Sequence, residues 1–153
     1  MTAAQLLAAV GLELSARAYP GGGGIRDAAQ LKLLGRFRPR VSGEFTWQTE
    51  VGMPIQGDLR AWDVALSGGS IRIGIDAETR LRDIQAVDRR VMLKLRDSGF
   101  DRAIVLVAAT RANRLALREV GSSLHGNYPV SARAALLALS AGVDPGGNSL
   151  IML

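Results

Sequence analysis

The chain has 153 residues and a formal net charge of +5, from 19 Lys and Arg against 14 Asp and Glu, and it contains no cysteine. This length suits one domain with a core of its own, and the missing cysteine excludes disulfides, thiolate metal sites and cysteine nucleophiles. No apolar run is long enough for a membrane span and we recognise no signal peptide, so we expect a cytoplasmic protein with no membrane partner.

Residues 1–24 predict a helix, a strand and a glycine-rich joint. The helix is expected over Ala3–Val10, and alternating apolar residues predict a strand over Leu12–Tyr19. Pro20 and the glycines Gly21–Gly24 end that strand. Because the glycine run lacks the Gly-Lys-Ser/Thr ending of a phosphate-binding loop, we interpret it as a flexible joint.

The next segment, 25–124, predicts a core that begins with a helix. The amphipathic stripe of Ala28, Leu31, Leu34 and Phe37 predicts this helix over Arg26–Arg38.

Three alternating segments then predict an antiparallel meander: Phe45–Val51, Leu59–Leu66 and 71–78. In the second strand, Trp62, Val64 and Leu66 are expected on one face and Asp63 on the other. In the third, Ile71, Ile73 and Ile75 are expected on the face opposite Arg72, Gly74, Asp76 and Glu78.

A long helix is predicted over Thr79–Asp97, ended by Gly99, and its stripe is Ile84, Val87, Val91, Met92 and Leu95. The β-branched run Ala103–Ala108 predicts a buried strand parallel to a neighbour, and Asn113–Val120 a further helix. Residues 125–153 add a helix over Ala132–Ser140 and a last strand over Leu150–Leu153. The whole is expected to be one α/β domain with a mixed sheet.

Three acids on the meander are the candidate site. Residues two apart on a strand share a face, so Asp76 and Glu78 point together, and the hairpin can bring Asp63 beside them. Converging carboxylates repel one another unless a cation lies between them, and Mg²⁺ or Mn²⁺ prefers such oxygen ligands. The carbonyl of Ala77 offers one more oxygen. Such a metal would polarise a phosphodiester.

The order helix, three antiparallel strands, long helix, buried strand, helix resembles the core of the restriction-endonuclease-like, or PD-(D/E)XK, nuclease superfamily over Ile25–Leu124. Segment 60–66 is similar to the family's Pro-Asp strand, with Trp62 where Pro is usual, and 73–78 is similar to its acid-X-Lys strand. The resemblance implies a Mg²⁺-dependent nuclease in which Asp63, Asp76 and Glu78 hold the metal and DNA is the partner.

Glu78 stands where the family usually has a catalytic lysine. Three alternatives follow: Glu78 fills the position itself, a shifted register makes Arg80 its substitute, or Lys94 reaches back from the long helix. We favour the register Asp76-Ala77-Glu78, because it keeps the three isoleucines in the core. Arg80 cannot readily act as a base, since it remains protonated.

A row of arginines every seven residues, Arg82, Arg89 and Arg96, is a candidate surface for a phosphate backbone. Gln85 lies where some relatives keep a substrate-orienting Gln. Simpler interpretations remain open: Asp63 pairs with Arg60 or caps a turn, the other two acids begin the long helix, and the arginine row is a solvated face.

A second resemblance concerns bacterial Xre-like helix-turn-helix proteins. Ala4–Pro20 is similar to the stretch that follows their DNA-reading domain, and segments 26–30 and 57–63 are similar to parts of the domain after it. We find no helix-turn-helix pattern, and the sequence leaves open a stand-alone form or the carboxyl-terminal part of a longer chain.

These observations predict a metal-dependent DNA nuclease. The alternative is an inactive nuclease-fold module that serves in DNA binding, regulation or dimerisation. In a dimerisation domain, the strand Leu12–Tyr19 would pair with its counterpart in a homodimer or pack on its own sheet.

Overall fold

The computed structural model describes residues 23–153. The predicted helix Ala3–Val10, the predicted strand Leu12–Tyr19 and the Xre-like stretch Ala4–Pro20 lie outside these residues. Helix α2 spans Gly23–Phe37, so the last two residues of the predicted glycine joint are helical. No helix in the described part of the chain is long and apolar enough to cross a membrane.

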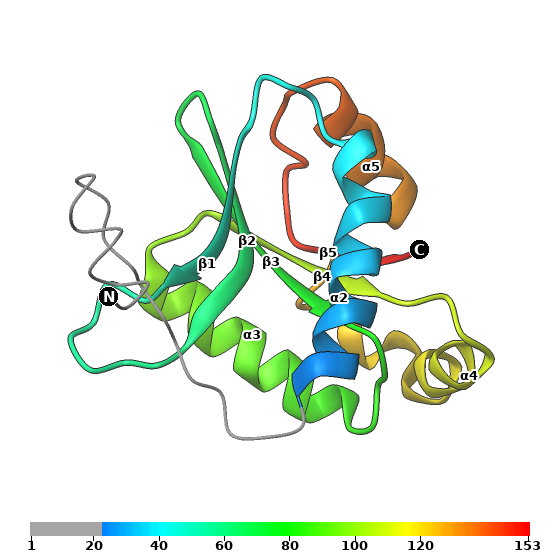
Figure 1. Cartoon of the computed structure of the whole chain (residues 1–153). Coiled ribbons are helices and arrows are strands. Elements are labelled where there is room, and N and C mark those ends of the chain that lie inside the picture. Colours follow the sequence, from blue (N-terminus) through cyan, green and yellow to red (C-terminus); the bar gives the residue numbers. More distant parts are fainter. Residues whose placement is uncertain (1–22) are drawn as a thin grey trace.

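The elements follow the predicted order (Figure 1). After α2 come η1 (Arg38–Arg40), β1 (Thr46–Gly52), β2 (Ala61–Gly68), β3 (Ile71–Glu78), α3 (Ile84–Ser98), β4 (Arg102–Val107), α4 (Arg111–Val120), η2 (Gly121–Leu124), α5 (Ala132–Ser140) and β5 (Ser149–Met152). The five strands form one sheet in the order β1-β2-β3-β4-β5. The first three are antiparallel, and β3, β4 and β5 are parallel. The predicted mixed α/β class is therefore confirmed.

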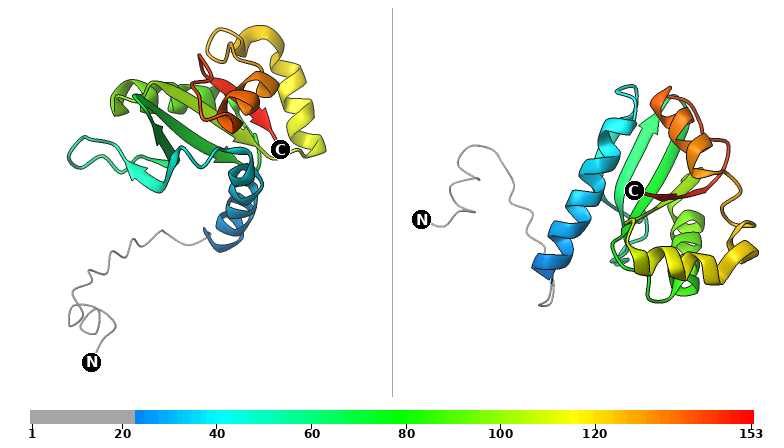
Figure 2. Two further views of the ribbon diagram at one scale, coloured as in Figure 1. Left: turned by 90° about the horizontal axis from the view of Figure 1, so that it is seen from above. Right: turned by 90° about the vertical axis from the view of Figure 1, so that its right-hand side faces the viewer.

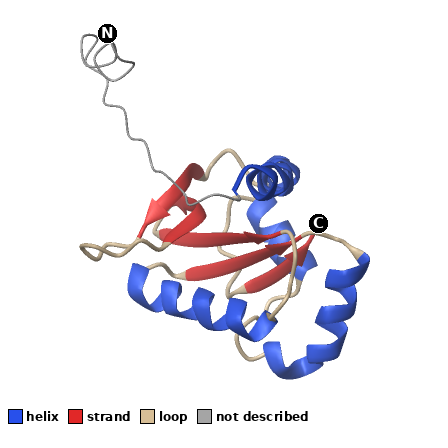
Figure 3. Ribbon diagram, turned by 60° about the horizontal axis from the view of Figure 1, so that its bottom comes forward, coloured by secondary structure: helices blue, strands red, loops and turns tan. Residues whose placement is uncertain are grey.

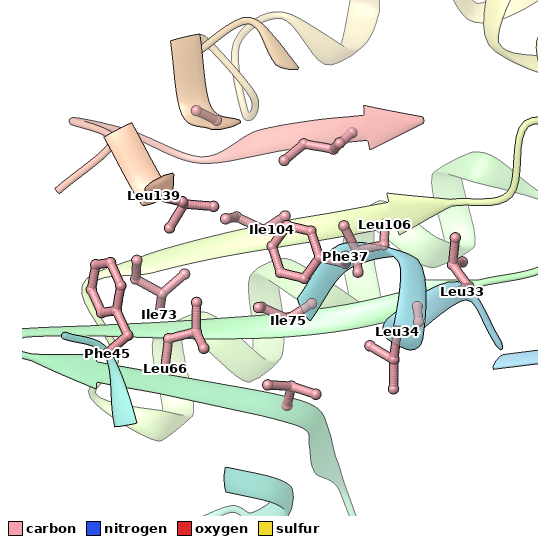
Figure 4. Close-up of a cluster of buried hydrophobic side chains, with 14 residues drawn as sticks. Leu33, Leu34, Phe37, Phe45, Leu66, Ile73, Ile75, Ile104, Leu106 and Leu139 are labelled. Carbon is pink, nitrogen blue, oxygen red and sulfur yellow. The ribbon is translucent and has the colours of Figure 1, made fainter. Parts of the chain in front are cut away.

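Helices cover both faces of the sheet, as the views in Figures 2 and 3 show. Helices α2 and α5 pack on the face that carries Ile73, Ile75 and Ile104, and Phe37 and Leu139 are fully buried there. Figure 4 shows this cluster. The isoleucine face of β3 is the one predicted from its alternation. Helix α3 packs on the opposite face through Val87 and Val91.

The predicted stripe of α2 is confirmed for Leu34 and Phe37 and wrong for Ala28 and Leu31, which are exposed. Leu31 is 66% exposed, whereas Leu33, Leu34 and Phe37 are buried. These three residues and Gln30 have the spacing i, i+3, i+4, i+7 of a single helix face. The inward face of α2 therefore includes a polar residue, which a search for apolar periodicity passes over.

Helix α3 begins at Ile84, five residues after the predicted Thr79. The Asp83 side chain accepts a hydrogen bond from the Ala86 amide and caps the helix. Residues 79–82 consequently form a loop, and Asp76 and Glu78 belong to β3 and do not begin the helix. The predicted end is confirmed, because Gly99 has a φ of 68°, in the left-handed region that glycine adopts readily.

Strand β2 does not keep one pattern of faces along its length. Val64 and Leu66 pack with α2 and α5, but Trp62 packs on the α3 side together with Ala65. The prediction that Trp62 shares a face with Val64 and Leu66 is therefore wrong. Hydrogen-bonded pairing of β2 with β3 ends at Val64↔Ile75, and on β1, opposite the break, Glu50 has a φ of 52°.

Gly74 explains why the indole fits there. A β-carbon at Gly74 would lie 2.3 Å from the ring of Trp62, so only glycine leaves room for it. The ring also stacks on Phe100, with centroids 5.9 Å apart. The space that Gly74 leaves on the sheet is therefore filled by the side chain of Trp62.

Candidate functional site

The end of β3 opens into a cavity of about 510 Å³ whose lining includes all three predicted acids, Asp63, Asp76 and Glu78. Three residues that the sequence offered as substitutes for a lysine or as phosphate ligands, Arg80, Arg82 and Lys94, line it too. The cavity therefore collects side chains from β2, β3, the following loop and α3.

Asp63 lies where β2 separates from β3. Its Oδ2 accepts a hydrogen bond from the Ala77 amide at 2.7 Å. Pairing of β2 with β3 ends at Ile75 of β3, so the Ala77 amide has no backbone partner on β2. The carboxylate of Asp63 provides the hydrogen-bond acceptor for this amide instead. Because the alternation of β2 is interrupted between Trp62 and Val64, the Asp63 side chain is directed into the space between the separating strands β2 and β3. The alternative pairing of Asp63 with Arg60 is wrong, because Arg60 binds Asp58 and Asp97.

Lys94 of α3 binds Asp76 in the interior. Its Nζ lies 2.8 Å from both carboxylate oxygens of Asp76 and 2.7 Å from the carbonyl oxygen of Ala61. Asp76 is 2% exposed and Lys94 7%. The ammonium also lies 5.4 Å from the centroid of the Trp62 ring. These oxygen contacts match the three protons of the ammonium group, so the buried charge is compensated.

Glu78 binds Arg90, which lies one turn before Lys94 on α3. The Arg90 Nε is also 3.7 Å from Asp76 Oδ2. Burial raises the pKa of Glu78 above its ordinary value, although the charge and hydrogen bond of Arg90 oppose the shift. Arg90 is not among the site residues predicted from the sequence. Its spacing of four residues from Lys94 puts both cations on one face of α3, and this was the signal available.

The pKa of Asp63 is raised to about 6, first by burial and then by the negative charge of Asp76. The Ala77 amide, the Lys94 charge and a hydrogen bond from Gln30 oppose that rise. Asp63 therefore exchanges its proton close to neutral pH, unlike an ordinary aspartate. A carboxyl group that titrates in this range can serve as an acid or a base.

Gln30 of α2 also lines the cavity, and its Nε2 donates to the Ala77 carbonyl oxygen at 3.3 Å. It holds the backbone oxygen that we had expected as an additional metal ligand. The predicted glutamine, Gln85, is exposed on α3 and does not line the cavity.

The three arginines of the predicted row do not lie on one helix. Arg82 precedes α3 and lines the cavity, whereas Arg89 is exposed on the helix and Arg96 pairs with Asp97 at 2.7 Å. The spacing of seven assumed one continuous helix from Thr79, and the late start of α3 removes Arg82 from it.

Within residues 23–153, no three His, Asp or Glu side chains are grouped closely enough to hold a metal ion. The oxygens of Asp63, Asp76 and Glu78 are of the type that Mg²⁺ prefers, but two of these acids already bind cationic side chains. The residues fit a hard cation by chemical type, whereas in this structure Arg90 binds Glu78 and Lys94 contacts both carboxylate oxygens of Asp76.

Comparison of the chain with protein-family models, with curated proteins and with solved structures finds no match. Any assignment of function therefore depends on the fold and on the chemistry of this cavity.

Proposed function

We propose that this chain is a metal-dependent nuclease of the restriction-endonuclease-like class that hydrolyses DNA phosphodiesters. The observation that carries the proposal is the buried pair of Lys94 and Asp76 beside Asp63, whose pKa is near 6, in one arginine-rimmed cavity. The order of elements and the sheet topology support the same class.

Lys94 is the proposed substitute for the lysine that the family usually has at the position of Glu78. The ammonium group that the resemblance requires comes from α3 instead of β3, and it contacts the first acid of the Asp76-Ala77-Glu78 segment. Of the three alternatives for the missing lysine, the contacts of Lys94 favour the reach from the long helix. Arg80 is retained in the proposal as a ligand of phosphate oxygens.

Each cavity residue then has a role. Arg80 and Arg82 bind and orient the phosphate at the rim, while Lys94 donates hydrogen bonds and balances the charge of Asp76. Asp63, in its deprotonated form, is the one of the three acids that pairs with no cationic side chain of the described residues, so it would be the first to accept a metal ion. When Mg²⁺ or Mn²⁺ is held by Asp63, Asp76 and Glu78, the ion supplies the Lewis acidity that polarises the phosphodiester.

The test is hydrolysis of supercoiled plasmid and of a short duplex, with single-stranded DNA and RNA of the same sequence alongside, in Mg²⁺, in Mn²⁺ and in EDTA. We expect cleavage that requires the metal and falls about 100-fold or more in Lys94→Met and in Asp63→Asn. Arg133→Ala, at an exposed position on α5, is the control. Absence of cleavage, or cleavage that both site variants retain, would refute the proposal.

The ion pairs favour one other candidate, an inactive module on the same scaffold. Asp76 and Glu78 are both neutralised by side chains of α3, which lowers their tendency to bind a metal. Such a module binds duplex DNA in EDTA, with an affinity that decreases as salt increases, and shows no turnover in either metal.

A further inference from the structure

Helix α4 carries a basic face that no role so far uses. Arg111, Arg114 and Arg118 follow one another at intervals of three and four residues, so they project from one side of the helix together with Leu115. These four residues line a shallow hollow of about 330 Å³. Leu115 is 58% exposed and is the apolar residue in the lining of the hollow.

This arrangement is unfavourable for the isolated protein. Like charges three and four residues apart on a helix repel each other, and Arg111 stands in the first turn, where the helix dipole disfavours a cation. Among residues 23–153, none of the three arginines takes part in an ion pair. The one acid of α4, Glu119, does not line the hollow. A bound polyanion would remove the repulsion.

The basic face of α4 is fixed to the cavity by a buried asparagine. Asn113, which is fully buried, accepts a hydrogen bond from the Leu81 amide at 2.9 Å and donates to the carbonyl oxygen of Thr79 at 3.1 Å. It therefore ties the first turn of α4 to the loop that carries Arg80 and Arg82. Figures 1 and 2 show α4 at one end of the sheet, near the loop that leads from β3 to α3.

We propose that the Arg111–Arg114–Arg118 face of α4 binds the phosphate backbone of a nucleic acid duplex whose cleaved phosphate lies in the cavity. The inference deepens the proposed nuclease function and rests on it for the position of the cleaved bond. Arginines suit this partner because each guanidinium can donate two parallel hydrogen bonds to one phosphate group. The regular spacing of duplex phosphates lets several guanidinium groups bind at once, whereas a single small anion would engage one or two.

The experiment measures binding of a fluorescent 30-base-pair duplex to the full chain in EDTA over a range of salt concentrations. The test variant is Arg111→Gln/Arg114→Gln/Arg118→Gln. The matched control, Arg36→Gln/Arg40→Gln/Arg133→Gln, removes the same charge from exposed positions on α2, η1 and α5. Since each lost phosphate contact lowers the slope of log affinity against log salt by about 0.9, the test variant should lower it by roughly 2 to 3. The control should lower it by much less.

Equal effects of the two triple variants would overturn the inference, because net charge alone would then explain them. So would an unchanged duplex affinity, or binding of anionic vesicles or an acidic protein that depends on these arginines while duplex binding does not. The thermal midpoint of the test variant should be equal to or above that of the wild type, since repulsion is relieved. Because no metal is present, a wild type that never cleaves DNA would refute the proposed function and leave this measurement intact.

Discussion

At the scale of single residues, the cavity is defined by two acids, the buried Asp76 and the half-buried Asp63, whose charges are compensated differently. Asp76 is paired with Lys94, whereas Asp63 receives an amide and has a pKa raised to about 6 by burial and by Asp76. Among the three acids of the cavity, Asp63 is therefore the one that pairs with no cationic side chain of the described residues.

The raised pKa makes folding stability depend on pH. Native Asp63 holds its proton up to about pH 6, whereas in the unfolded chain it loses the proton near its ordinary pKa of 3.8. Native protein thus binds more protons between these values, and the contribution of Asp63 to stability falls as pH rises, by about 3 kcal/mol in all. Asp63→Asn should lack this fall, so urea unfolding at pH 4.5, 6 and 7.5 should show the variant gaining on the wild type.

Asp144 gives a control of the opposite sign. Burial raises its pKa, but hydrogen bonds from Arg102 and from the Gly146 amide lower it more, and its pKa lies below the ordinary value. Its stabilisation is present above the unfolded pKa and is lost as pH falls through the native one. Asp144→Asn should therefore lose stability relative to the wild type at neutral pH, and a gain there would contradict the assignment.

Removal of Lys94 should be costly. Lys94→Met leaves Asp76 buried without its partner, which should lower the free energy of unfolding by about 3–5 kcal/mol. Adding Asp76→Asn should recover much of this loss, because the remaining group is neutral. A double-mutant cycle from urea unfolding measures the coupling energy, and additive effects of the two substitutions would show that the pair is not formed.

At the scale of elements, the order of helices and strands could be predicted from the sequence, because the periodicities of β3, α3 and β4 are unbroken. The interruption in β2 could not. Alternation places Trp62 with Val64, and only the pairing of its ring with Gly74 across the sheet moves it to the α3 side. The same break turns Asp63 toward Ala77. Asp63 therefore lies in the site as predicted, but it is placed there by the irregularity of β2 and not by the regular alternation on which the prediction was based.

Two residues of the site could not be assigned from the sequence alone: Gln30 was not predicted, and Lys94 was predicted only as one of three alternatives. Gln30 occupies an inward position of α2, where a search for apolar residues finds nothing. Lys94 was one of three alternatives for the missing lysine, since helix periodicity gives its direction but not the distance to β3. The distances from Gln30 and Lys94 to β3 are set by the packing of α2 and α3 on the sheet, which the local sequence pattern does not contain.

The packing of Trp62 on Gly74 is open to a direct test. Gly74→Ala places a methyl group within 2.3 Å of the indole ring and should destabilise the fold by about 1–3 kcal/mol or more. In Gly35→Ala, on the exposed side of α2, the added methyl meets no atom within 4 Å, and the change should stabilise by about 0.4–1 kcal/mol. Thermal unfolding distinguishes these results, and equal midpoints would mean that Trp62 does not lie over Gly74.

At the scale of the whole molecule, the positive charges behind the net charge of +5 are not all compensated to the same extent. Acidic partners neutralise Arg60, Arg90 and Arg102, whereas the arginines of the α4 face have none within residues 23–153. Net charge from the sequence indicates that polyanions will be attracted. The position of the uncompensated charge, at one end of the sheet beside the loop of Arg80, requires the fold.

The enclosure of Lys94 has a chemical consequence. The chain contains two lysines, and Lys32 is exposed on α2 whereas Lys94 is 7% exposed and fully hydrogen-bonded. An amine-acylating reagent followed by peptide mass mapping should thus modify Lys32 within minutes and Lys94 only as fast as α3 lifts from the sheet. The ratio of the two labels would report how often the interior of the site meets solvent, without any substrate or assumed activity.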